Sequence, residues 1–150
     1  MAGIPKSALY IGLAGLLPFI WGVITVHLPA LSEWTIKMIG PRFVGLYVQL
    51  FYGAVILSFM SGVLWGFATK TEGKQAAIGY TLSVVPALWA FFMIGGGPET
   101  ASQNLIAGFI GLLALDWYFW TSSQAPAWWM RLRLLLTGMV FLCLILGRIA

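Results

Sequence analysis

The sequence predicts an all-α integral membrane protein in which five transmembrane helices form a compact bundle with short loops. Hydrophobic residues make up 61 % of the 150-residue chain and charged residues only 8 %, whereas soluble domains carry about 25 % charged residues. A soluble fold of this size cannot bury so much apolar surface. The charges also divide the chain into apolar stretches that reach the roughly 20 residues needed to cross a bilayer as a helix. These stretches lack the alternation typical of barrel strands.

Residues 8–28 form the first predicted span, in a stretch whose only titratable side chains are Tyr10 and His27. Lys6 precedes this stretch, as in a secretory signal peptide, but the apolar part exceeds the roughly 7–15 residues of such a peptide. We therefore expect an uncleaved helix. The connection that follows contains SEWTIKMI at residues 32–39, which is equally consistent with a short interfacial helix and with an irregular loop.

Residues 46–68 form the second predicted span, the centre of the predicted bundle. It lies in a run of 27 residues, 43–69, without Asp, Glu, Lys, Arg or His. Small side chains recur in it at every fourth position and form one stripe: Ala54, Ser58, Gly62 and Gly66. Such stripes let helices approach closely in lipid. We therefore predict that this stripe is the main helix-packing surface.

Residues 76–94, 102–120 and 128–148 form the other three predicted spans. A polar turn precedes the first of them. A segment containing three glycines and Pro98 follows it, and the span ends there because such a segment cannot continue a helix. Pro18 and Pro86 lie inside the first and third spans and predict kinks there. By its length, the chain forms a single transmembrane domain, residues 1–150.

The basic residues predict the orientation. With five spans, those on the N-terminal side are Lys6, Lys70, Lys74, Arg131 and Arg133. Those on the other side are Lys37, Arg42 and Arg148. Because cytoplasmic loops carry the excess of basic residues, we expect a cytoplasmic N-terminus and a periplasmic C-terminus in a bacterial inner membrane. In a eukaryote, the mitochondrial inner membrane is expected.

Asp116 is the one acid well inside a predicted span. Arg131 and Arg133 lie about one turn into the next span, and an antiparallel hairpin would bring them level with Asp116. We therefore predict a structural ion pair, which neutralises a costly charge in lipid. The alternative is a proton-relay or ligand carboxylate, but a relay normally needs further buried acids, and the sequence offers none.

No cofactor or metal site is predicted. His27 is the only histidine and Cys143 the only cysteine. A haem or chlorophyll ligand is conceivable at His27, but one histidine without a second ligand is more typical of an interfacial polar residue. Bound lipid or pigment could still lie at the surface.

Four tryptophans flank the turn between the last two spans: Trp117, Trp120, Trp128 and Trp129. Such rings prefer the headgroup level of the bilayer. We therefore predict a membrane-interface belt; the alternative is an aromatic ligand pocket.

Four segments resemble the transmembrane-protein-69-like family: ALYIGLAGLLPF (8–19), YGAVILSFMSGVLWGF (52–67), VVPALWAF (84–91) and PAWWMRLRLLLT (126–137). The second and fourth are the most specific. The resemblance implies a five-helix protein of bacterial and mitochondrial membranes, from a family of unknown function. It brings no established activity and no catalytic residues.

The sequence favours a non-catalytic accessory or assembly subunit that packs against a larger respiratory or photosynthetic complex. It has no GxSxG, HExxH, P-loop or CxxC motif, so an intramembrane enzyme is disfavoured. The alternative is a small carrier or ligand-binding protein that uses the two proline-kinked spans and Asp116. The expected partners are membrane lipids and other integral membrane subunits. The scattered basic residues do not predict nucleic-acid binding.

Overall fold

The computed structural model describes residues 3–149, and within them it contains helices and no strand. The helices are α1 (Lys6–Ala14), α2 (Leu17–His27), α3 (Pro29–Ile39), the 3-10 turn η1 (Pro41–Phe43), α4 (Gly45–Ala68), α5 (Gly73–Ser83), α6 (Val85–Met93), α7 (Pro98–Thr121) and α8 (Trp129–Arg148). Five segments in this part of the chain are long and apolar enough to cross a membrane: Lys6–His27, Gly45–Ala68, Gly73–Met93, Pro98–Thr121 and Trp129–Arg148. The prediction of an all-α membrane protein with five spans is confirmed.

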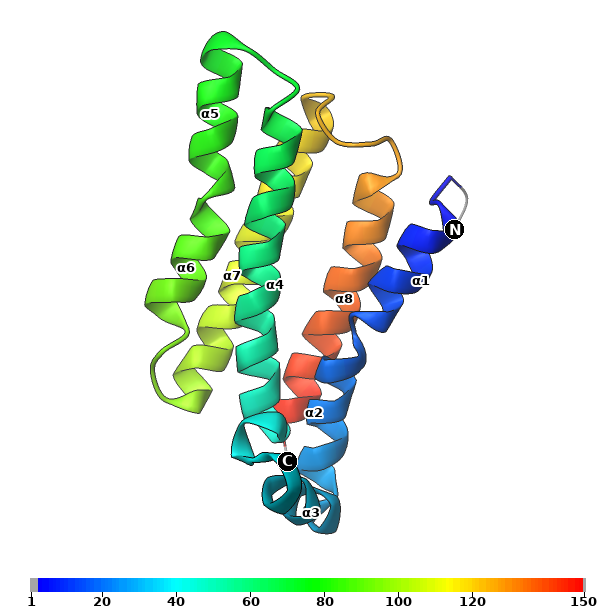
Figure 1. The fold of residues 1–150 in the computed structure, drawn as a ribbon, viewed down its shortest axis with the longest axis vertical. Coiled ribbons are helices and arrows are strands. Elements are labelled where there is room, and N and C mark those ends of the chain that lie inside the picture. Colours follow the sequence, from blue (N-terminus) through cyan, green and yellow to red (C-terminus); the bar gives the residue numbers. More distant parts are fainter. Residues whose placement is uncertain (1–2, 150) are drawn as a thin grey trace.

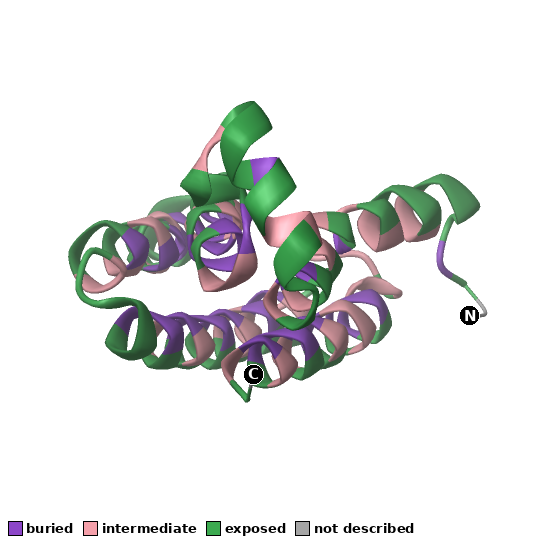
Figure 2. Ribbon diagram, turned by 90° about the horizontal axis from the view of Figure 1, so that it is seen from below, coloured by how far each residue is buried: buried purple, intermediate pink, exposed green. Residues whose placement is uncertain are grey.

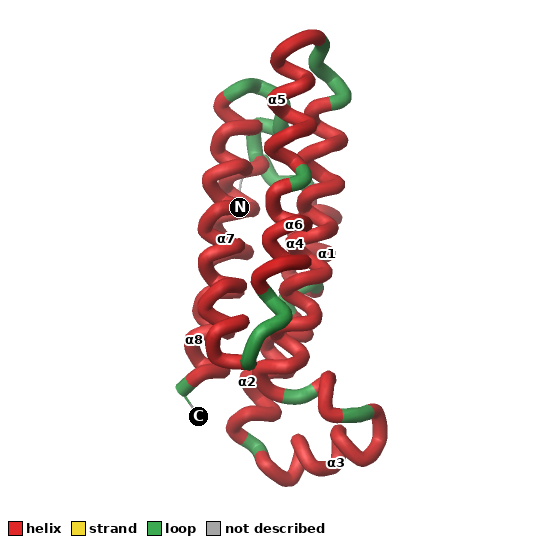
Figure 3. Tube along the Cα trace, turned by 90° about the vertical axis from the view of Figure 1, so that its left-hand side faces the viewer, coloured by secondary structure: helices red, strands yellow, loops and turns green. Residues whose placement is uncertain are grey.

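The spans form two layers (Figures 1 and 3). The segments α5–α6, α4 and α1–α2 make one layer, and α7 and α8 make the other. Figure 2 shows the buried residues on the sides of the helices that face one another. The largest fully buried side chains include Phe19, Leu57, Leu64, Leu105, Phe109, Leu112, Phe119 and Leu144. The core therefore lies between the layers, with α4 as the helix that touches most of the others.

Two prolines divide two of the spans. Pro18 lies in the first turn of α2 and Pro86 in the first turn of α6. Because proline has no N–H, neither can donate to the carbonyl four residues earlier. At the second break a neighbouring helix supplies a partner, since the backbone N–H of Ala87 donates to Ser61 Oγ of α4 at 2.8 Å. Membrane bundles tolerate a proline kink when a neighbouring helix supplies a hydrogen-bond partner for a freed backbone group.

The stripe predicted as the packing surface of α4 does not face the bundle. Ser58, Gly62 and Gly66 are exposed and Ala54 is only half-buried. Apart from the adjoining part of its own helix, a Cβ built at Gly62 or Gly66 would meet no atom of residues 3–149 within 4 Å. The buried residues of α4 lie on another side of the helix, at Val48, Gln49, Leu50, Gly53, Leu57, Met60, Ser61, Leu64 and Ala68. The prediction was wrong because the lipid-facing and protein-facing sides of this helix are both apolar, so small residues did not identify the buried side.

Other glycines allow neighbouring helices to pack closely against one another. A Cβ at Gly22 of α2 would lie 2.7 Å from the carbonyl oxygen of Gly45. One at Gly108 of α7 would lie 2.7 Å from Trp89 Cδ1. Both distances are shorter than side-chain carbons accept, so a methyl group would have to displace the backbone of α4 at Gly22 and the ring of Trp89 at Gly108. These contacts hold α2 to α4 and α6 to α7.

The connection after the first span contains a true helix. Residues 32–39, for which a helix and a loop were equally expected, belong to α3, which lies across the end of the bundle (Figure 3). Trp34, Met38 and Ile39 of α3 are exposed. Exposed apolar side chains on a helix across the end of a bundle suit the bilayer interface. The C-terminus lies near this end, while α1 begins toward the other (Figure 1).

Candidate functional site

A buried ion pair joins α7 to α8. The side chain of Asp116 is fully buried, and Arg133 Nε donates to its Oδ2 at 2.8 Å. Trp129 Nε1 donates to the other carboxylate oxygen, Oδ1, at 3.0 Å. Both oxygens of Asp116 therefore have a donor on α8, which is the condition under which a charge pair persists in an apolar interior. The structure records the predicted pair for Arg133.

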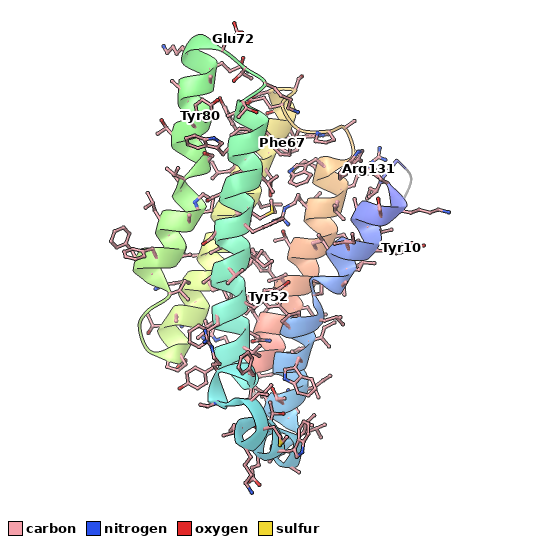
Figure 4. The ribbon with its side chains drawn as sticks, in the orientation of Figure 1. Tyr10, Tyr52, Phe67, Glu72, Tyr80 and Arg131 are labelled. Carbon is pink, nitrogen blue, oxygen red and sulfur yellow. The ribbon has the colours of Figure 1, made fainter. Side chains whose placement is uncertain are left out.

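Arg131 lies elsewhere. A Cβ built at Gly3 would stand 3.3 Å from Arg131 Nη1. Figure 4 shows Arg131 near the start of α8, beside the segment that leads into α1. Its position near a helix end is typical of a membrane-edge anchor.

The four tryptophans have different environments. Trp117 is exposed, and its ring lies 5.4 Å from that of Trp120, whose Nε1 donates to the carbonyl of Ala127. Trp128 is half-buried at the start of α8. Trp129, besides its bond to Asp116, packs edge-on against Phe67 with ring centres 5.1 Å apart. Trp129 therefore belongs to the ion-pair site as well as to the turn.

His27 ends α2 and is exposed. Its Nε2 lies 3.3 Å from the carbonyl oxygen of Leu146. Over residues 3–149, no group of three His, Cys, Asp or Glu side chains could hold a metal ion. The position of His27 at a helix end is that of an interfacial polar residue.

A cavity of about 580 Å³ adjoins the ion pair. Its walls come from α1 and α2, with the break between them, and from α4, α7 and α8. The inner wall includes the buried rings of Phe19 and Phe109, whereas Ile11, Val55 and Phe59 at the rim are exposed. The cavity therefore opens sideways, between α1 and α4, toward the surface that meets lipid. Its volume is within the roughly 300–1,000 Å³ of small-molecule pockets.

The apolar cavity has one polar region. Arg133 and Thr137, one turn apart on α8, both line it. Arg133 Nη2 and Thr137 Oγ1 are buried and have no hydrogen-bond partner in the described part of the chain. Tyr52 of α4 also lines the cavity, and Figure 4 shows it on the side of α4 that faces α2 and α8. This arrangement can hold and orient a molecule but offers no nucleophile with a base beside it.

Sequence reasoning missed the cavity and missed Gln49. Gln49 is fully buried in α4, and its Nε2 donates to the carbonyls of Phe19 and Cys143, each at 3.0 Å. It thus ties α4 to both α2 and α8. The available signal was a single amide side chain in a charge-free run, because such a group needs partners inside a membrane.

The chain is similar to known proteins along nearly all its length. A family model described as "Protein of unknown function (DUF3429)" matches residues 4–149. Transmembrane protein 69 of Xenopus tropicalis is 34 % identical over 137 residues, which cover 89 % of this chain and 50 % of that protein. Transmembrane protein 69 of Mus musculus is 31 % identical over 148 residues, covering 92 % and 54 %. The chain thus spans about half the length of these relatives, and no solved structure matches it.

Proposed function

The chain belongs to the family described as Protein of unknown function (DUF3429), and we propose that it is a non-catalytic accessory or assembly subunit of a larger membrane complex. The relatives named above are transmembrane proteins, which places this chain among integral membrane proteins. The proposal concerns what it does there: it binds a helix of another membrane protein.

The outward stripe of α4 carries the proposal. Ser58, Gly62 and Gly66 are exposed along the helix at every fourth position, with open space over both glycines. Ser58 Oγ donates to its own helix, at the carbonyl of Ala54, so the stripe presents no unbonded donor. A smooth surface of small residues lets a second backbone come close, and the contact then gains van der Waals energy that lipid chains supply less well.

The placement of the acidic side chains is compatible with a non-catalytic role. Of the four acids, Glu33, Glu72 and Glu99 are exposed near helix ends. The fourth, Asp116, already accepts from Arg133 and Trp129. Both of its oxygens bond to side chains of α8, so its structural contribution is to hold α7 to α8.

We propose an energy-transducing membrane as the place of action. The support is the family resemblance, which implies a protein of bacterial and mitochondrial membranes. The partner is then a subunit of a respiratory or photosynthetic complex, and it presents an apolar helix with small side chains. In a bacterial inner membrane, the distribution of basic residues favours a cytoplasmic N-terminus.

The test is migration on native gels after mild solubilisation of native membranes. The unchanged protein should run far above its 16.4 kDa mass, together with integral subunits of such a complex. Gly62→Leu should release it, because the side chain fills the space that a partner backbone would occupy. Gly138→Leu is the matched control, since a Cβ at Gly138 also meets nothing within 4 Å among residues 3–149 apart from the adjoining part of its own helix, but Gly138 lies on α8. Migration of the unchanged protein alone would contradict the proposal.

A second candidate function is ligand binding in the membrane. One observation favours it, the cavity that reaches Arg133 and Thr137. Gly15 and Leu16, at the break between α1 and α2 in the kinked first span, line the cavity. The kinked third span does not, since none of its residues lines this cavity. Asp116 takes part only through its bond to Arg133.

A further inference from the structure

We propose that the cavity between α1–α2, α4 and α8 binds a neutral lipid-like molecule whose head carries a carbonyl oxygen. The inference goes beyond the docking role of α4 and specifies the ligand for the second candidate function. It depends on three properties of the cavity: its polar region, its charge balance and its opening.

The polar region lacks a partner. Arg133 is 5 % exposed and Thr137 is 2 % exposed, and both line the cavity. Arg133 Nη2 and Thr137 Oγ1 find no hydrogen-bond partner in residues 3–149. Leaving a buried donor unbonded is costly. Since Nη2 carries only donors, the group that satisfies it must be an acceptor, and Thr137 Oγ1, one turn further along α8, can also donate to an acceptor.

The charge balance selects a neutral acceptor. The guanidinium of Arg133 already has its counter-charge in Asp116, 2.8 Å away. No other Lys, Arg, Asp or Glu side chain lines the cavity. A bound anion would therefore leave one unmatched negative charge inside the membrane, which is costly. A carbonyl oxygen meets the same donors without that cost.

The lining and the opening of the cavity favour a ligand whose main part is apolar. Apart from Arg133, Thr137 and Tyr52, the cavity is lined by glycine and apolar side chains. Its exposed rim, formed by Ile11, Val55 and Phe59, lies on the surface that faces lipid. A ligand would then enter sideways from the bilayer, with its chain toward the rim and its head toward α8. Two kinds of membrane molecule have this chemistry, a quinone with an apolar tail and an acyl ester such as a diacylglycerol.

The test uses the full chain in vesicles of diether phosphatidylcholine, because ordinary ester phospholipids would themselves offer carbonyl groups. The probes are a decyl-substituted benzoquinone, dioctanoylglycerol, decylbenzene, which has no oxygen, and decanesulfonate, which is always anionic. The measurement is saturable uptake above that of protein-free vesicles. The quinone, the diacylglycerol or both should bind near one molecule per chain, and which of them binds identifies the source. Decylbenzene and decanesulfonate should bind at least tenfold more weakly.

Substitutions then test the contact atoms. Thr137→Val should weaken binding of the carbonyl probe about fivefold, the worth of one ordinary hydrogen bond. It removes a hydroxyl that bonds to nothing else described, so the fold should be unaffected. Thr81→Val is the control, since Thr81 is exposed, bonds to its own helix and lies outside this cavity. Val55→Trp, at the rim, should reduce uptake of every probe by narrowing the opening.

Four results would overturn the proposal. These are the absence of saturable uptake, equal affinity for decylbenzene, tighter binding of decanesulfonate, and unchanged carbonyl affinity in Thr137→Val. None of them bears on Gly62 and Gly66 of α4, so this proposal and the docking function can fail separately.

Discussion

Arg133 Nε lies 2.8 Å from Asp116 Oδ2, and this contact joins α8 to α7 in a part of the bundle that excludes water. We predict that Asp116→Asn lowers the thermal midpoint in detergent, with a loss on the order of 3 kcal/mol. The amide can still accept from Trp129, but Arg133 loses its counter-charge in an apolar surrounding.

Glu99→Gln is the matched control. Glu99 and Arg148 also form an ion pair, at 3.7 Å, but the side chain of Glu99 is 82 % exposed. Such exposed pairs contribute little, so the midpoint should hardly move. Equal effects of the two substitutions would show that the buried pair does not stabilise the bundle.

Alanine substitutions at Gly22 of α2 and Gly62 of α4 should have opposite effects on the stability of the protein. Gly22→Ala should destabilise the protein by about 1–3 kcal/mol, because its Cβ would lie 2.7 Å from the backbone oxygen of Gly45 and overpacking costs about that much. Gly62→Ala should be tolerated or slightly stabilising, since its Cβ meets no described atom within 4 Å and alanine favours a helix. Thermal unfolding of the purified chain checks both. A larger loss at Gly62 would place its surface inside the bundle.

The hydrogen bond from Ala87 to Ser61 at the kink between α5 and α6 can be tested by substituting two serines of α4. Ser61→Ala removes the acceptor of the Ala87 N–H, which should cost about 1–3 kcal/mol, as for other unbonded buried donors. Ser58→Ala should be mild, because Ser58 is exposed and bonds only to its own helix. Circular dichroism during heating gives the comparison. If the two variants melt together, Ala87 has another acceptor.

The five spans and the ion pair could be predicted because both depend on sequence spacing and charge. Span length follows from bilayer thickness, and breaks at Lys70–Lys74 and at Pro98 were visible in the chain. A buried acid needs a cation, and α8 offered two. The choice between Arg131 and Arg133 could not be made, since it depends on how α8 is rotated against α7.

The packing surface and the cavity could not be predicted from local pattern. Small residues at 54, 58, 62 and 66 suit contact with any helix, within the chain or outside it. The cavity arises where the chain breaks at Gly15 and Leu16, leaving α1 with no buried residue. No spacing in the sequence shows how far such a break displaces a helix.

Thiol labelling tests the orientation of the chain in the membrane. Because Arg133 is buried against Asp116, the basic residues near the membrane edges are Lys6, Lys70, Lys74 and Arg131 on one side and Lys37, Arg42 and Arg148 on the other. The side with four should be cytoplasmic. In a Cys143→Ala background, Gly96→Cys should react with an impermeant thiol reagent in intact cells, and Glu72→Cys should not. The reverse labelling would invert the topology.

The most direct test of the proposed function is site-specific photocrosslinking in native membranes. A photoreactive residue at Ser58, in the outward stripe of α4, should crosslink to one membrane protein in high yield. The same residue at Ile110, which is exposed on α7 in the other layer, should give only lipid adducts. The proposed function would be contradicted by lipid adducts alone from Ser58, or by the same protein crosslinking equally from both positions.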